Sequence, residues 1–121
     1  MLRTAFTDLV GCQVPIQLAP MGGGVVTSEL AIAVTRAGGL GMLQRTGPGP
    51  LADRIGQLEQ ARAGPFGVNF TLYNPSPGDR AEIELAAGRA RLVGVGQVTS
   101  VTPAAQVVAE LAEGAEQLLR R

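Results

Sequence analysis

Consecutive glycines that follow a short apolar run are the feature of this sequence most suited to chemistry. Residues 14–19, VPIQLA, are typical of a buried parallel strand, and the turn Pro20–Gly24 follows at once. Peptide groups without side chains leave room for a ligand and offer N–H donors to it. Because ligands bind at the carboxyl ends of the strands in parallel α/β folds, this turn is the first candidate binding site.

The same turn matches neither of the common nucleotide-binding patterns. It lacks the G-x-G-x-x-G spacing of dinucleotide folds and the G-x-x-x-x-G-K-[ST] spacing of a P-loop. A second interpretation therefore stays open, in which the glycines serve only a tight turn from strand to helix.

Side chains for acid–base or metal chemistry are scarce. The chain has no histidine and one cysteine, Cys12, so it offers no usual zinc ligand set and no internal disulfide, and it fits a reducing compartment. Cys12 is expected to be a small buried side chain at the end of the sheet opposite the glycine turn. Asp79, Glu82 and Glu84 are the carboxylates nearest the third expected strand, but they are interpreted as a solvated helix face and not as a base. Tyr73 is interpreted as an ordinary loop aromatic, with a place at the mouth of the site as the alternative. No catalytic residue and no metal ligand is assigned.

Around the glycine turn, expected strands and helices alternate. The expected elements in chain order are a strand at 14–19, a helix capped by Thr27 or Ser28 and stopped by Gly38–Gly39, a strand at 40–43, a helix from Pro50 to Gly64 and a strand at 66–70. This order predicts a parallel α/β sheet with right-handed crossovers.

The second half of the chain is less regular until its last helix. Residues 79–91 are expected to be helical, and residues 92–96 form a weak strand candidate. The last helix is predicted from Thr102 as N-cap, Pro103 at the first helical position and an apolar stripe that follows.

Composition and charge narrow the class of partner. The ten basic residues are all arginines, and ten acidic residues balance them. A net charge of zero disfavours nucleic acid and anionic membrane surfaces, which are bound through clustered positive charge. No apolar run reaches the roughly 18–20 residues of a membrane span, and the amino terminus does not resemble a secretory signal. We therefore expect one small cytoplasmic domain.

The first 75 or so residues resemble the N-terminal part of the nitronate monooxygenase family, which are FMN-dependent TIM barrels. The resemblance lies in PIQLAPMGGGVVTSELAIAVTRAGGLGML, followed after a helix by PFGVNF. It implies that Pro20, Met21, Gly22 and Gly23 lie against the flavin ring of FMN and that Asn69 contacts it. The alternative for Met21 is packing in the core. The alternative for Asn69 is a residue that ends the strand and hydrogen-bonds its own loop. The same residues are similar to the FMN-dependent enoyl-acyl-carrier-protein reductases.

The tail GVGQVTSVTPAAQVVAELAEGAEQLLRR resembles the end of the same family. Together the two matches imply a barrel without its middle, joined near residues 73–90, so that the catalytic histidine and the phosphate-binding loops are absent. The expected fold is α/β, a partial (β/α)8 TIM barrel of three to four parallel strands with flanking helices and a C-terminal helix. Residues 1–75 would form its N-terminal βαβαβ portion and residues 76–121 a C-terminal segment, in which Gln97 is a substrate-binding candidate.

Two classes of function follow from the resemblance. The first is a nitronate monooxygenase-like flavoprotein that oxidises alkyl nitronates with oxygen, inactive as this shortened chain. The alternative is a non-catalytic remnant or interaction module, or a fragment of an enoyl-acyl-carrier-protein reductase. An exposed sheet edge would favour homo-oligomers.

Overall fold

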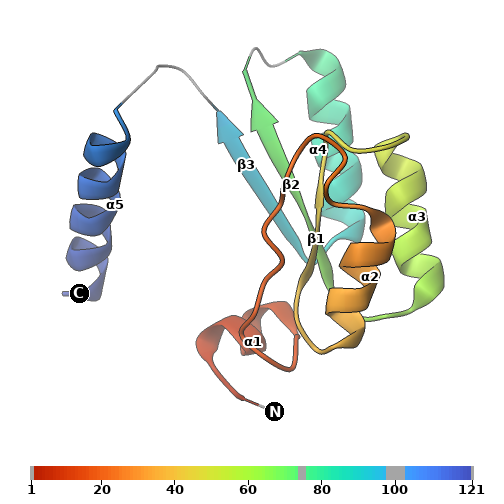
Figure 1. The fold of residues 1–121 in the computed structure, drawn as a ribbon, viewed down its shortest axis with the longest axis horizontal. Coiled ribbons are helices and arrows are strands. Elements are labelled where there is room, and N and C mark those ends of the chain that lie inside the picture. Colours follow the sequence, from red (N-terminus) through yellow and green to blue (C-terminus); the bar gives the residue numbers. More distant parts are fainter. Residues whose placement is uncertain (1, 74–75, 98–102, 121) are drawn as a thin grey trace.

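A computed structural model describes residues 2–73, 76–97 and 103–120 of the chain. In this part of the chain, helices α2, α3 and α4 pack on one face of a three-stranded parallel sheet (Figure 1). The elements are α1 Ala5–Val10, α2 Ser28–Arg36, β1 Gly41–Gln44, α3 Leu51–Ala61, β2 Phe66–Leu72, α4 Pro77–Arg89, β3 Leu92–Gln97 and α5 Ala104–Leu119. The predicted α/β fold is confirmed, and its order of strands and helices is that of part of a (β/α)8 barrel.

The sheet has the order β1-β2-β3, so each strand lies beside the next one in the chain. Gln44 is in register with Asn69, and Asn69 is in register with Gly94. Paired residues of a parallel sheet point to the same face, so these three residues form one row across the sheet. We call the face that carries this row, opposite α2–α4, the inner face.

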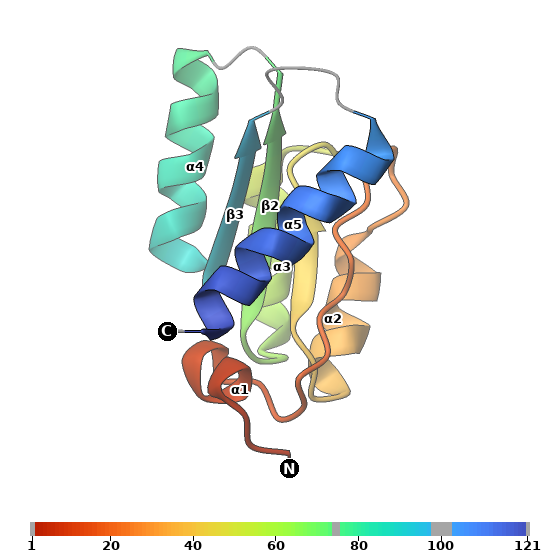
Figure 2. The ribbon, with the colours of Figure 1, turned by 90° about the vertical axis from the view of Figure 1, so that its left-hand side faces the viewer.

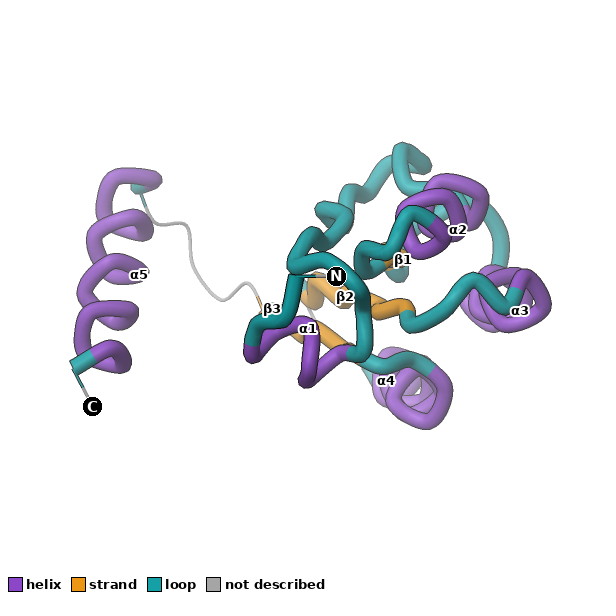
Figure 3. Tube along the Cα trace, turned by 90° about the horizontal axis from the view of Figure 1, so that it is seen from below, coloured by secondary structure: helices purple, strands orange, loops and turns teal. Residues whose placement is uncertain are grey.

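The two faces of the sheet have separate apolar cores. The larger core lies between the sheet and α2–α4 and includes Leu43, Ile55 and Phe70, whose side chains are fully buried. The smaller core lies under the inner face, where Val10 of α1 packs with Leu40, Met42 and Cys12. Figure 3 shows α1 at the amino ends of the strands, which it covers. Cys12 is therefore buried at that end of the sheet, as expected.

Local capping explains where the helices begin and end. The Thr27 side chain accepts a hydrogen bond from the Leu30 N–H, so Thr27 is the N-cap of α2. After α2, Gly38 adopts a left-handed φ of 95°, which ends the helix as the sequence predicts. Helix α3 ends earlier than expected, because Arg62, with a φ of 46°, takes the left-handed cap position before Gly64.

The prediction of a strand at residues 14–19 is wrong, because this segment forms no regular strand. Residues 14–19 meet β1 at one isolated bridge, Gln17 with Leu40, where Leu18 donates to the Leu40 carbonyl and Leu40 to that of Ile16. Pro20 has no N–H to donate toward β1, and the Ile16 N–H donates to the Val14 carbonyl instead, so the ladder does not extend in either direction. The segment still runs parallel beside β1, where the first strand of the barrel was expected. Helix α1 was not predicted.

Helix α5 stands apart from the sheet on the side of the inner face, as Figures 1 and 2 show together. It begins at Ala104, one residue after Pro103, and the predicted cap Thr102 lies outside the described residues. No helix of the described part is long and apolar enough to cross a membrane.

Candidate functional site

A cavity of about 220 Å³ lies at the carboxyl ends of β1 and β2, on the inner face of the sheet. It is lined by Pro20, Gly22, Gln44, Thr46, Thr71 and Tyr73. The glycine turn thus meets the ends of two strands, at the edge of the sheet where parallel α/β folds bind ligands.

Strand periodicity explains why polar groups gather at this cavity. Successive rows of the inner face lie two residues apart, because side chains alternate between the faces of a strand. The row nearest the amino ends is Met42, Gly67 and Leu92. Its two side chains, Met42 and Leu92, are apolar and pack in the core over α1. The next row is Gln44, Asn69 and Gly94, and above it Thr71 pairs with Gly96. The inner face therefore changes from apolar to polar in one step toward the carboxyl ends.

The middle row is held by a hydrogen bond between two side-chain amides. Asn69 Nδ2 donates to Gln44 Oε1 at 2.9 Å, and the Gln44 side chain is only 5% exposed. On its other side, Asn69 lies over Gly94, where a Cβ atom would come within 2.7 Å of Asn69 Oδ1. Gly94 is thus the residue that leaves room for the Asn69 amide.

Most of the predicted cofactor-binding residues come together at this edge. Pro20 and Gly22 line the cavity, and Asn69 is joined to it through Gln44. The Met21 side chain is 40% exposed, so the alternative of core packing is wrong for it. Gly23 is exposed, with a φ of 69°, in the adjoining surface hollow that shares Thr46. Residues 21–24 are exposed, so no helix of the described part of the chain packs over the turn.

Gln97 is the last residue of β3, in register with Leu72, at the same edge of the sheet. Its side chain lies outside the described part of the structure, so the expected substrate role stays a prediction. Gln44, Thr46 and Thr71 were not predicted from the sequence.

The spacing of two residues between Gln44 and Thr46, at the end of an apolar strand, was the signal that could have indicated the first two. Tyr73 also lines the cavity, which agrees with the alternative given for it and not with an ordinary loop aromatic.

A buried arginine holds the end of β1 beside this cavity. Arg54 of α3 is 3% exposed and donates from Nη1 to the Gln44 carbonyl at 2.7 Å and from Nη2 to the Arg45 carbonyl at 2.6 Å. Burial lowers the pKa of the guanidinium, and the charge of Glu82 opposes this effect. Arg54 thereby ties the backbone that carries Gln44 to helix α3.

The interpretation of Asp79, Glu82 and Glu84 as a solvated helix face holds only in part. It is wrong for Asp79. Asp79 is 6% exposed, caps α4 by accepting from the Ser76 N–H and hydroxyl, and lies 2.6 Å from Arg45. These hydrogen bonds from Ser76 lower the pKa of Asp79, and Arg45 contributes further. Glu82 also pairs with Arg45, whereas Glu84 is exposed and pairs with Arg80. The three carboxylates lie on α4, which covers the face of the sheet opposite the cavity, and each forms an ion pair.

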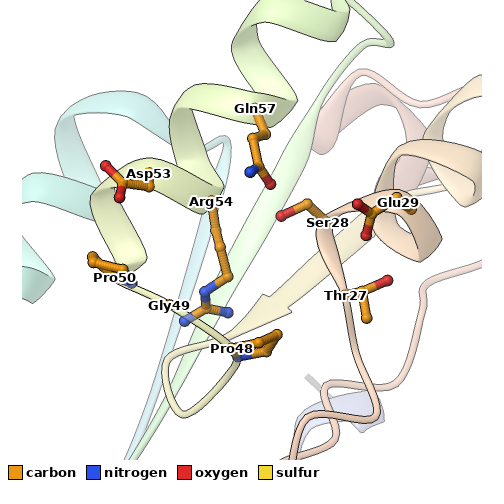
Figure 4. Close-up of a pocket in the computed structure, with 9 residues that line it drawn as sticks. All are labelled: Thr27, Ser28, Glu29, Pro48, Gly49, Pro50, Asp53, Arg54 and Gln57. Carbon is orange, nitrogen blue, oxygen red and sulfur yellow. The ribbon is translucent and has the colours of Figure 1, made fainter.

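A second cavity, of about 300 Å³, lies outside the sheet between the amino ends of α2 and α3. Figure 4 shows Ser28 and Gln57 pointing toward one another across it, with the Arg54 guanidinium beside Pro48 and Gly49. Glu29 and Asp53 also line it, so its charge is mixed.

The fold is that of part of a (β/α)8 barrel, and the solved structure of FabK shares it. FabK from Thermotoga maritima is 31% identical, with a TM-score of 0.63, over 93% of this chain and 35% of FabK. The nitroalkane oxidase of Streptomyces ansochromogenes is 40% identical over 70% of this chain and 25% of its own, with a TM-score of 0.48.

Residues 3–116 match the sequence model of the protein family described as nitronate monooxygenase, so the chain belongs to this family. Among curated proteins, the nitronate monooxygenase of Pseudomonas aeruginosa strain PAO1 is 42% identical over 78 residues, which are 63% of this chain and 22% of that protein. The chain thus spans about a fifth of this relative and about a third of FabK.

Proposed function

We propose that the inner-face cavity binds the ring system of FMN, and that the chain supplies this part of a flavoprotein that oxidises alkyl nitronates with oxygen. The observation that carries the proposal is the meeting of the glycine turn with the Gln44–Asn69 row in a chain of the nitronate monooxygenase family. The cofactor-binding residues proposed from the sequence are Pro20, Met21, Gly22, Gly23 and Asn69.

The residues around the cavity suit a flat heteroaromatic ring. A Cβ atom on Gly22 would approach Thr46 Oγ1 to 3.3 Å, and one on Gly94 would crowd Asn69. Bare backbone at these positions leaves space beside amide and hydroxyl groups that can bond ring oxygens and nitrogens. When bound, FMN supplies the redox chemistry that the side chains of this chain lack. The chain itself binds and orients the ring.

Turnover is a separate question from binding. The 121 residues include no histidine, the side chain best suited to take a proton near neutral pH. We therefore propose that this polypeptide binds flavin without oxidising nitronates, and that Gln97 lies near the substrate in a complete enzyme. A cytoplasmic location and homo-oligomers formed through the sheet edge belong to the same proposal.

The test is a titration of the purified 121-residue chain with FMN, followed by quenching of flavin fluorescence, with oxygen uptake measured on an alkyl nitronate. Saturable binding near one flavin per chain, with oxygen uptake at background, is the expected result. A folded chain that leaves the fluorescence of FMN unchanged would rule out the flavin proposal. Oxygen uptake above background would rule out the proposed lack of turnover.

A second candidate is a fragment of an FMN-dependent enoyl-acyl-carrier-protein reductase, favoured by the likeness to FabK over 93% of the chain. Both candidates place the same ring in the same cavity, so flavin binding does not separate them. They differ in the substrate of the complete enzyme. Oxidation of a nitronate or reduction of an enoyl thioester by a complete barrel that contains this segment decides between them. A non-catalytic interaction module would bind no flavin and would form oligomers in size-exclusion chromatography.

A further inference from the structure

We propose that the cavity between the amino ends of α2 and α3 is a second binding site, and that it takes a small zwitterion of the amino-acid class. We call this cavity of about 300 Å³, which is lined by the residues labelled in Figure 4, the outer cavity. Its lining residues all differ from those of the inner-face cavity, so the inference does not depend on flavin binding.

A buried serine hydroxyl points into the outer cavity. Ser28 is the first residue of α2 and is only 4% exposed, and its hydroxyl has no hydrogen-bond partner in the described part of the chain. Figure 4 shows this hydroxyl directed toward Gln57 on the opposite wall. A buried hydroxyl that makes no hydrogen bond raises the free energy of the folded state. An acceptor atom of a ligand in the cavity removes this cost.

The guanidinium of Arg54 brings positive charge and further donors to the same cavity. Its bonds to the Gln44 and Arg45 carbonyls use two of the five N–H donors that a guanidinium has. Its Nε atom is buried without a hydrogen-bond partner among the described residues. Gly47 packs so closely against the group that a Cβ atom there would overlap Nη1. The charge is therefore fixed in place beside the cavity.

The amino ends of α2 and α3 add backbone donors to this wall. The first N–H groups of a helix have no partner within the helix and form the positive end of its dipole. Pro50, the N-cap of α3, makes no side-chain hydrogen bond to them. Together with Ser28 and Arg54, the two helix ends form a set of donors that matches a carboxylate group.

Two exposed carboxylates make the outer cavity a poor site for a simple anion. Glu29 and Asp53 line it, each from the first turn of its helix. Two carboxylates beside one guanidinium repel a simple anion and attract an ammonium group. A zwitterion matches both sets of groups, with its carboxylate on Ser28 and Arg54 and its ammonium group on Glu29. A volume of about 300 Å³ is at the small end of ligand pockets and suits a molecule of amino-acid size.

The experiment compares three probes of one carbon skeleton on the full 121-residue chain. L-Alanine carries both charges, propionate lacks the ammonium group and ethylammonium lacks the carboxylate. Each is titrated into the isotope-labelled chain at constant ionic strength, and amide NMR follows the N–H signals of Ser28 and Glu29. We expect saturable shifts with L-alanine and binding of the other two probes that is weaker by roughly tenfold or more. Propionate that binds as tightly as L-alanine, or L-alanine that leaves both signals unmoved, would overturn the proposal.

Variants separate the two charges of the ligand. Ser28→Ala removes one donor to the carboxylate, so it is expected to weaken L-alanine and propionate alike, by roughly tenfold. Glu29→Gln keeps the shape but removes the partner of the ammonium group, so it should weaken L-alanine without weakening propionate. Glu110→Gln makes the same change at an exposed position of α5 and is the matched control. A merely structural role for Glu29 would not distinguish the two probes.

Circular dichroism checks that each variant folds. If Ser28→Ala does not fold, the exposed Glu29→Gln carries the test, and an affinity for L-alanine equal to that of Glu110→Gln would overturn the proposal. FMN titration of Ser28→Ala should match the wild type, because Ser28 lines only the outer cavity of the two. A wild type that binds L-alanine but no flavin would support this inference while the proposed function fails.

Discussion

Replacing the buried guanidinium of Arg54 with a methionine should loosen the end of β1. Arg54 donates to the carbonyls of Gln44 and Arg45 at 2.7 and 2.6 Å, and its side chain is 3% exposed. Methionine fills much of the same space, but it leaves two carbonyls that no other described donor reaches. Helix α3 would then remain packed on the sheet while the backbone that carries Gln44 is released.

The magnitude follows from the two hydrogen bonds and the burial of the charge. Hydrogen bonds to charged groups contribute about 1.5–3 kcal/mol each, so two of them amount to roughly 3–6 kcal/mol. The burial that lowers the pKa of Arg54 opposes this gain, since the variant no longer desolvates a charge. We therefore expect Arg54→Met to reduce the free energy of unfolding by about 2–4 kcal/mol.

Urea unfolding followed by circular dichroism measures this loss, with Arg36→Met, at an exposed position of α2, as the control. The loss should be nearly the same at low and high salt, because a buried charge is screened little. An Arg54→Met chain as stable as the wild type would refute the reasoning. A loss that disappears in high salt would show instead that Arg54 acts through exposed charges.

Two further predictions concern packing and pH. A Cβ atom on Gly41 would overlap the Ala31 carbonyl and Thr35 Oγ1. Gly41→Ala should therefore lower the free energy of unfolding in urea by about 3 kcal/mol or more. A stability equal to wild type would disprove the close approach of α2 and β1. Because hydrogen bonds from Ser76 lower the folded pKa of Asp79, its stabilisation is present above the ordinary carboxyl pKa of about 3.9 and is lost as pH falls through the folded value. The stability advantage of wild type over Asp79→Asn should therefore shrink toward about pH 2 in urea unfolding, and a constant advantage would contradict it.

Local signals were sufficient for most of the elements that build the sheet. Thr27 as cap, the helical spacing that follows it and the stop at Gly38 predicted α2, and the apolar run at 66–70 predicted most of β2. The division into residues 1–75 and 76–121 stays a prediction. Helix α1 was missed because it has only six residues and begins with a capping box in which Thr7 takes the usual place of glutamate.

What the sequence did not reveal depends on partners distant in the chain. The candidate turn was found from its glycines alone, but the amide row exists only once β1 and β2 are in register. Asn69 was noticed through a family resemblance, whereas Gln44 meets it 25 residues away along the chain. Asp79 was taken for a solvated carboxylate because its partner Arg45 follows β1, far from Asp79 in the sequence.

The step from apolar to polar rows on the inner face sets how deep a bound molecule can reach. Rows on one face of a strand are separated by about 6.6 Å, twice the rise per residue. Met42 and Leu92 form an apolar row one step beneath the amides, on the side of the core that contains Val10 of α1. A ligand in the inner-face cavity would therefore rest on this apolar row, close to the rim of the sheet, and would meet only the few polar residues between that row and the strand ends.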